Sequence, residues 1–218
     1  MTSLDTTPRS GADTFVRYAM LASAVIAPLT LGLALLLAPG DITAEGAAYV
    51  GGFIAEADSY PASAWLSALS AITIIPGALA VARVARAGRP ALGLVAMILA
   101  FVMIVPVGGN SDDVLYAGVQ AGVDPATLTK IYTAYGESLP TSIFGMSFFL
   151  GLLGFLLLGV AALLGRTAPR WAAITLIVAP VLVPIPWFAG LGGLAAGGAW
   201  LLMAIGMGGV ALGLLNDR

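Results

Sequence analysis

Six long apolar stretches constrain the fold of this chain more than any other feature of its sequence. The hydrocarbon core of a bilayer is about 30 Å thick, and a helix needs roughly 20 apolar residues to cross it. Each stretch meets or approaches that length, and none carries an ionisable residue near its centre. The pattern predicts an all-α integral membrane bundle that forms a single domain over residues 1–218. The predicted spans cover residues 17–38, 63–84, 90–107, 141–164, 171–189 and 191–215.

The composition supports a membrane protein. Hydrophobic residues make up 60% of the chain and charged residues 9%, whereas soluble proteins have roughly 25% charged residues. Twenty charged side chains, nine basic and eleven acidic, are too few to cover a soluble domain of this length. Lipid is therefore the expected solvent of most of the surface.

Three of the predicted spans depend on where their helices begin or end. The third reaches full length only if its helix begins directly after Arg89. The last two are separated by little more than Gly190 and are predicted to form a tight hairpin. A single helix through both is disfavoured because proline interrupts helical hydrogen bonding, at Pro180, Pro184 and Pro186.

The first stretch has an alternative interpretation as a cleaved signal peptide. Its apolar run of about 20 residues exceeds the roughly 7–15 residues of a signal-peptide core. Pro39, Gly40 and Asp41 follow it, where cleavage would require small residues. We therefore expect a retained first span.

The charged residues predict the orientation of the bundle. Eight of the nine basic residues lie at the termini or in the predicted inner connections: Arg9, Arg17, Arg83, Arg86, Arg89, Arg166, Arg170 and Arg218. Lys130 is the exception. Eight acidic residues lie in the two long connections on the other side: Asp41, Glu45, Glu56, Asp58, Asp112, Asp113, Asp124 and Glu137. Cytoplasmic loops are enriched in Lys and Arg, so we predict a plasma (inner) membrane protein with both termini in the cytoplasm.

Both long outer connections, residues 39–62 and 108–140, contain patterns of short amphipathic helices. In the second, Asp124 is a predicted N-cap followed by Pro125 at the first helical position. The apolar face that follows is Leu128, Ile131, Tyr132 and Tyr135. Ser111 can cap a shorter helix that carries Val114, Leu115 and Val119, and the first connection has a similar face: Tyr49, Val50, Phe53 and Ile54. The sequence predicts a small helical cap on the outer side.

The missing residue types exclude several kinds of chemistry. The chain has no His and no Cys, which removes His-ligated haem or zinc and His-dependent catalytic triads. Ionisable residues inside the membrane mark proton relays, coupled transporters and voltage sensors, and the predicted spans have none near their centres. We expect no cofactor, no nucleic-acid partner and no catalytic residue, although the sequence leaves an enzymatic role open.

Three groups of residues are candidate sites, each with a plainer alternative. Asp58, Asp112 and Asp113 are weak candidates for a divalent-cation site, but acidic residues on the outer side can simply be solvated. Two further sets follow helical spacing. A hydroxyl stripe is a possible polar path or a packing face: Ser63, Ser67, Ser70 and Thr73. A glycine stripe is a possible homo-oligomer face, with packing inside the bundle as the favoured alternative: Gly193, Gly197, Gly209 and Gly213.

Part of the sequence resembles a family of uncharacterised actinobacterial polytopic membrane proteins that carry a domain of unknown function. The resemblance covers about residues 105–190 and rests on the residues 159–163 (GVAAL) and 168–172 (APRWA). It also includes Asp124-Pro125 followed by Tyr132 and Tyr135. It implies a six-span bundle in the plasma membrane and assigns no catalytic residue.

These observations favour an accessory membrane protein that binds membrane lipid or a membrane or extracytoplasmic protein partner. The alternative is a channel or carrier for a small neutral or apolar solute, suggested by the hydroxyl stripe and the span prolines. An enzyme that acts on lipid is a further alternative, which would require the outer acids to converge on a polar pocket.

Overall fold

The computed structural model describes residues 11–104 and 111–216, and within them every regular element is helical. The elements that form the bundle are α1 (Gly11–Leu36), α3 (Tyr60–Gly88), α4 (Pro90–Ile104), α7 (Leu139–Gly165), α8 (Arg170–Leu182), α9 (Ile185–Ala189), α10 (Gly192–Ala211) and α11 (Gly213–Asn216). Those of the outer connections are α2 (Gly46–Ala55), the 3₁₀ helix η1 (Ala57–Ser59), α5 (Ser111–Gln120) and α6 (Pro125–Gly136). The predicted all-α fold is confirmed.

Five helical stretches are long and apolar enough to cross a membrane: Gly11–Leu36, Ala57–Gly88, Gly145–Gly165, Arg170–Ala189 and Gly192–Leu215. The predicted third span corresponds to α4, which begins at Pro90, directly after Arg89, as the sequence requires. Its 15 described residues are apolar but shorter than the other five stretches. Residues 105–107 of that predicted span lie outside the described residues.

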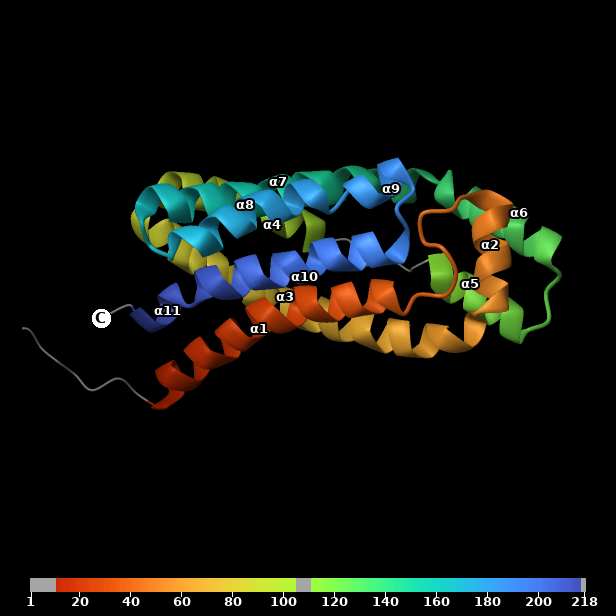
Figure 1. Cartoon of the computed structure of the whole chain (residues 1–218), viewed down its shortest axis with the longest axis horizontal. Helices are drawn as coiled ribbons and strands as arrows, with labels where there is room; N and C mark the ends of the chain where they lie inside the picture. The colour runs from red at the N-terminus through yellow and green to blue at the C-terminus, as the bar shows by residue number, and fades with distance from the viewer. Residues whose placement is uncertain (1–10, 105–110, 217–218) are drawn as a thin grey trace, which may run out of the picture.

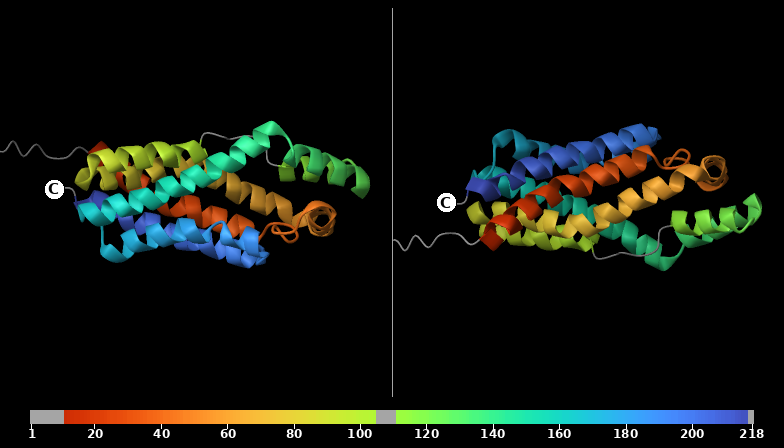
Figure 2. Two further views of the ribbon diagram at one scale, coloured as in Figure 1. Left: turned by 90° about the horizontal axis from the view of Figure 1, so that it is seen from above. Right: turned by 90° about the horizontal axis from the view of Figure 1, so that it is seen from below.

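The long helices form a closed ring. The contacting pairs follow the order α1, α3, α4, α7, α8, α10 and back to α1, and α3 also contacts α7 and α10 across the ring. The described ends of the chain lie together at one end of this bundle (Figure 1), and α2, α5 and α6 lie beyond the other end (Figures 1 and 2). The ring therefore positions the outer connections as a separate layer, which we call the cap.

Apolar side chains fill the centre of the ring. The largest that are fully buried there come from four of its helices, from α11 and from the break after α8: Val81, Phe155, Leu158, Leu176, Val183, Met203, Met207 and Leu214. Trp200, near the middle of α10, is also buried and lies against Phe148, with 6.4 Å between the ring centroids. The centre is thus packed with side chains that favour neither ions nor water.

Neighbouring helices approach one another at glycines. A Cβ built on Gly154 of α7 would lie 2.1 Å from the backbone N of Ala100 in α4. On α10, a Cβ on Gly197 would lie 2.7 Å from the carbonyl O of Gly32 in α1. Small residues allow this close backbone packing between membrane helices, so these glycines set the spacing of the ring.

The predicted fifth and sixth spans are each interrupted. Residues Val183 and Pro184 separate α8 from α9, which divides the predicted span 171–189. Leu212 separates α10 from α11 within the predicted span 191–215. The first break follows from proline, which lacks the N–H that a continuing helix needs.

The hairpin predicted around Gly190 is present. Gly190 ends α9 in the left-handed conformation with φ 62°, and the N–H of Leu191 donates to the carbonyl O of Pro186 at 3.0 Å. Glycine adopts this conformation without steric cost. At the opposite end of the bundle, Arg17 Nη1 of α1 donates to the carbonyl O of Leu214 at 2.7 Å, which joins the first helix to the last.

Candidate functional site

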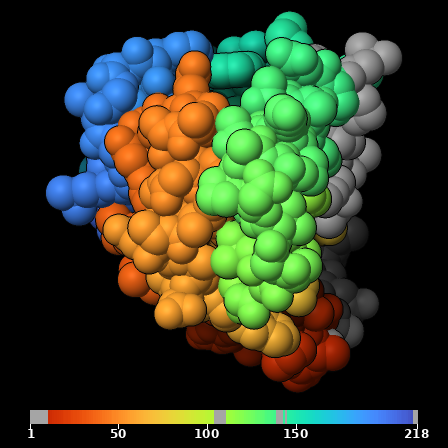
Figure 3. All heavy atoms as spheres, turned by 90° about the vertical axis from the view of Figure 1, so that its right-hand side faces the viewer, coloured from red at the N-terminus to blue at the C-terminus, as the bar shows by residue number. Residues whose placement is uncertain are grey.

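The cap contains its own apolar cluster, separate from the centre of the bundle. Its buried members are Tyr49, Val50, Phe53, Ala57, Tyr60, Leu115 and Leu128, contributed by α2, η1, α5, α6 and the start of α3. In Figure 3 the chain around α2 and the chain of α5 and α6 lie side by side over the end of the molecule. Two connections that are far apart in sequence therefore form one folded unit.

Most residues of the predicted amphipathic faces belong to this cluster or pack against it. Tyr49, Val50 and Phe53 of α2 are buried, and Ile54 packs against them. Elsewhere the prediction is only partly confirmed: Leu115 and Leu128 are buried, and Val119 and Tyr132 pack against the cluster. Val114 and Ile131 are 41% and 40% exposed, so the buried face of each helix is narrower than the predicted one.

Two helix starts in the cap follow local sequence signals. The carboxylate of Asp124 accepts a hydrogen bond from the N–H of Thr127 at 3.0 Å, so the predicted N-cap is confirmed. The side chain of Thr127 and, to a smaller extent, its backbone N–H stabilise the carboxylate and lower the pKa of Asp124. The shorter helix is present as α5, but Ser111, its predicted cap, is the first described residue of the helix itself.

Two tyrosine–aspartate hydrogen bonds join the two long segments that form the cap, the one that contains α2 and the one that contains α5. The hydroxyl of Tyr49 donates to Asp112 Oδ1 at 2.7 Å, and that of Tyr60 donates to Asp113 Oδ1 at 2.5 Å. Asp112 and Asp113 stand in the first turn of α5, where negative charge is favoured by the helix dipole. Hydrogen bonds to an ionised group are stronger than neutral ones, so these pairs fix α5 against α2 and α3.

Burial raises the pKa of Tyr49 far above its usual range, and the Asp112 carboxylate adds to that effect. The pKa of Tyr132 is raised for the same leading reason, with smaller contributions from Asp112 and Glu45. Tyr132 lies against Tyr49 with 5.1 Å between their ring centroids. Both phenols therefore stay protonated at neutral pH as hydrogen-bond donors.

The first connection is also fixed to the bundle. Thr43 Oγ1 donates to Asp41 Oδ1 at 2.7 Å and accepts from the N–H of Gly192 at 3.2 Å. The N–H of Gly40 donates to Glu56 Oε2 at 2.9 Å. These contacts place the cap at a defined position over the turn between α9 and α10.

A groove of about 680 Å³ opens beside the cap cluster. It is lined by Glu45 and Gly46 at the start of α2, by Ser111 of α5, and by residues at the end of α6: Tyr132, Thr133, Tyr135 and Glu137. Two carboxylates and two aromatic rings thus face one space. That combination suits a cationic group, since carboxylates attract it and aromatic rings offer their electron-rich faces.

The three candidate cation ligands, Asp58, Asp112 and Asp113, do not form a cluster of three acids. Asp112 and Asp113 each accept a tyrosine hydroxyl, and Asp58 is exposed on η1. Among the described residues, no group of three or more acidic side chains is arranged to hold a metal ion.

The four hydroxyl side chains of the stripe on α3 differ in burial and in what they contact. Ser63 and Ser70 are buried, and Ser67 lines a cavity of about 590 Å³ beneath the cap together with Trp65. Thr73 donates to the carbonyl O of Leu69, four residues earlier in its own helix, at 2.7 Å.

The glycine stripe of the last span lies against other helices of the same chain. A Cβ on Gly193 would meet Leu35 and one on Gly197 would meet Leu36, both in α1. A Cβ on Gly209 would meet Trp171 and Ala172 of α8, and one on Gly213 would meet Val84 of α3.

The tyrosine–aspartate pairs and the groove were not predicted from the sequence. Tyr49 and Asp112 are 63 positions apart, and no local pattern relates them. The signal that was available is the presence of two tyrosines on buried helical faces, since a buried hydroxyl needs a hydrogen-bond partner.

No family model, curated protein or solved structure matches this chain.

Proposed function

We propose that this chain is a six-span plasma-membrane protein with both termini in the cytoplasm and the cap on the outer side. The distribution of arginine supports this topology, as does the position of α4, which lies in the ring between α3 and α7. The described ends of the chain lie at the end of the bundle opposite the cap, which fits an even number of crossings.

We infer that its function is to bind a membrane or extracytoplasmic protein partner through the cap groove. The observation that carries this proposal is a cap with its own core and a groove of about 680 Å³ beside it. Glu45 and Glu137 favour a partner segment that carries a Lys or Arg side chain, which Tyr132 and Tyr135 can contact through their rings. The proposed activity is recognition and assembly, with no chemical step.

A channel or carrier is less well supported. A path for a solute would have to pass the apolar side chains at the centre of the ring, among them Phe155, Leu158 and Met203. A lipid-active enzyme is also less well supported, because Asp112 and Asp113 each accept a tyrosine hydroxyl and only two of the described outer acids, Glu45 and Glu137, line the cap groove.

Site-specific photocrosslinking in living cells tests the cap groove. A photoreactive phenylalanine analogue at Thr133, which lines the groove, is expected to give a discrete crosslinked product. The same analogue at Ala126, exposed elsewhere on the cap, is expected to give none. Replacing Glu45 or Glu137 with glutamine should lower the yield at position 133 by about 1.4- to fivefold, since an exposed ion pair contributes about 0.2–1 kcal/mol.

The matched control is Asp58→Asn, which removes one exposed charge from η1 without altering the lining of the groove. It should leave the yield unchanged. Equal yields at positions 133 and 126, or a yield at 133 that ignores Glu45→Gln and Glu137→Gln, would refute the proposed binding surface.

A further inference from the structure

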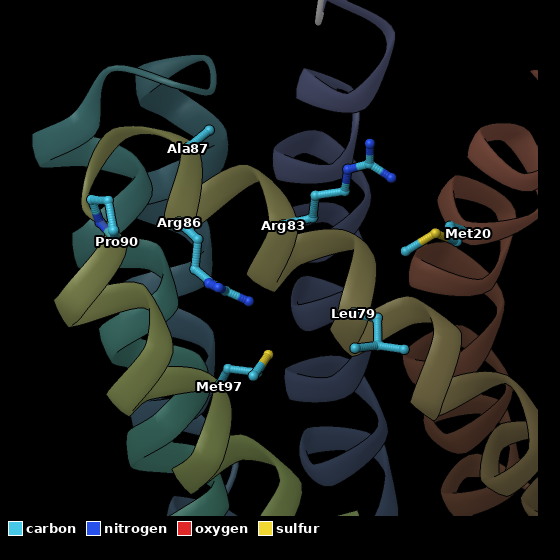
Figure 4. A pocket seen from close by; sticks show the side chains of 7 residues that line it. All are labelled: Met20, Leu79, Arg83, Arg86, Ala87, Pro90 and Met97. Carbon is cyan, nitrogen blue, oxygen red and sulfur yellow. The ribbon is translucent and has the colours of Figure 1, made fainter. Parts of the chain in front are cut away.

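A second groove lies near the end of the bundle opposite the cap and contains two arginines (Figure 4). Its volume is about 450 Å³, and its lining includes Arg83, Arg86 and Leu79 of α3, Met20 of α1, and Met97 and Pro90 of α4. The Arg86 side chain extends toward Met97, and that of Arg83 lies on the side of Met20. Charged groups therefore occur within a mainly apolar groove.

The arginines continue an apolar stripe on the outer surface of α3. Leu79, Arg83 and Arg86 are spaced four and three residues apart, which places them on one helical face. Toward the cap, the same face carries Ile75 and Ile72, which are 44% and 73% exposed. Exposed isoleucines on a membrane helix face lipid chains, so the arginines stand where that lipid-facing surface reaches the basic end of the bundle.

The packing of α4 positions Arg86. A Cβ on Gly93 of α4 would lie 2.7 Å from Arg86 Cγ and 2.9 Å from its backbone N. Glycine at this position lets α4 approach α3 closely enough to hold the stem of the arginine. The helix α4 begins at Pro90, in the wall of the groove, so the positive end of its dipole adds to the charge.

The two guanidinium groups of the groove have no acidic partner among the described residues. Within residues 11–104 and 111–216, neither Arg83 nor Arg86 forms an ion pair or a hydrogen bond through its guanidinium. Of the described acidic residues, Asp13 at the start of α1 does not line the groove, and the others belong to the connections at the cap end. Two cationic groups with fork-shaped donors beside an apolar surface match an anion that carries hydrocarbon chains.

We propose that this groove binds the phosphate headgroup of an anionic phospholipid, with the acyl chains along the stripe of Leu79, Ile75 and Ile72. Basic pockets between membrane helices on the cytoplasmic side bind anionic headgroups for the same electrostatic reason. The apolar stripe distinguishes a lipid from free phosphate, because free phosphate gains nothing from it. The inference rests on the proposed membrane embedding of the chain and does not depend on the cap groove.

Native mass spectrometry of the purified full-length protein tests the site. The protein is mixed in detergent with dioleoyl phosphatidylglycerol and then released from the detergent in the mass spectrometer. The number of bound lipids is compared among the unmodified protein, Arg83→Gln, Arg86→Gln and the double variant. Each arginine near an anionic lipid contributes about 1 kcal/mol, so each single variant should bind phosphatidylglycerol about fivefold more weakly. The matched control is Arg170→Gln, which removes an exposed arginine at the start of α8, outside the groove.

The proposal expects three results together: preference for phosphatidylglycerol over phosphatidylcholine, loss in the groove variants, and unchanged binding in Arg170→Gln. Glycerol phosphate, which has the headgroup phosphate without chains, should not compete. Competition by glycerol phosphate at equal concentration would assign the groove to a free phosphate compound and overturn the lipid. An equal loss of lipid binding in Arg170→Gln would mean that net charge, and not the groove, determines binding. Equal binding of phosphatidylcholine would mean that the two arginines do not recognise an anionic headgroup. Either result would overturn the proposal.

Discussion

Replacing Gly154 with alanine is expected to lower the free energy of unfolding by about 3 kcal/mol, the upper part of the usual range for overpacking. The added Cβ would lie 2.1 Å from the backbone N of Ala100 and 2.7 Å from its Cα. Backbone atoms of a packed helix cannot rotate away as a flexible side chain can, so α4 and α7 must separate. That movement would open the ring between α4 and α7.

Thermal unfolding in detergent measures this effect, and about 3 kcal/mol corresponds to a fall of about 10 °C in Tm for a chain of this size. The control is Gly145→Ala on the same helix, where a Cβ would meet nothing within 4 Å. Alanine favours a helix over glycine by about 1 kcal/mol, so Gly145→Ala should leave Tm unchanged or raise it. Equal Tm values for the two variants would show that α4 and α7 do not pack as described.

The second large effect is expected from Tyr49→Phe. This change keeps the ring in the cap cluster and removes the hydroxyl that donates to Asp112 at 2.7 Å. A hydrogen bond to a charged group contributes about 2 kcal/mol, and loss of that amount should speed amide exchange in α2 and α5 about 30-fold. Exchange in the ring helices should not change, because Tyr49 belongs to the cap cluster.

Tyr18→Phe is the matched control, since Tyr18 is 57% exposed on α1. Hydrogen exchange measured by mass spectrometry should not distinguish it from the unmodified protein. If Tyr49→Phe leaves exchange in α2 and α5 unchanged, the bond between Tyr49 and Asp112 does not stabilise the cap.

The raised pKa of Tyr49 also gives the cap a dependence on alkaline pH. Its pKa in the folded cap lies above the ordinary value of 10.0, so the folded state holds the proton more tightly than the unfolded state. The stabilisation is fully present below pH 10.0 and is lost as pH rises above it, by about 1.4 kcal/mol per pH unit for one such group. Phenolate absorbance during a pH titration should show Tyr49 ionising later than exposed tyrosines, together with Tyr60 and Tyr132, whose pKa values are also raised by burial. The late phase should be smaller by one tyrosine in Tyr49→Phe.

The sequence was sufficient for the features that depend on local pattern. Apolar length placed the long helices, Asp124 marked the start of α6, and Gly190 marked the hairpin between α9 and α10. Each of these is determined by residues within one or two helical turns. The break at Pro184 could also have been predicted, because this proline is itself evidence against one helix through the last two spans. The stretch 171–189 was nevertheless predicted as one span.

Features that depend on distant residues could not be predicted. Gly154 and Gly145 occur in similar apolar surroundings on one helix, and only the position of α4 distinguishes them. The arginines at positions 83 and 86 gave the predicted orientation, whereas the groove around them depends on the approach of α4 at Gly93. The pairing of Tyr49 with Asp112 likewise required the packing of the two outer connections against each other.

In a six-span topology α4 crosses the membrane, so single cysteines on either side of α4 are accessible from opposite sides of the membrane. The chain has no cysteine, so Ala87→Cys and Ala126→Cys, both at exposed positions, can each carry the only thiol. With a membrane-impermeant maleimide on intact cells, the six-span topology gives labelling at position 126 and none at position 87 until the membrane is opened. Labelling of both positions from the same side would mean that α4 does not cross the membrane and that the chain does not have six spans.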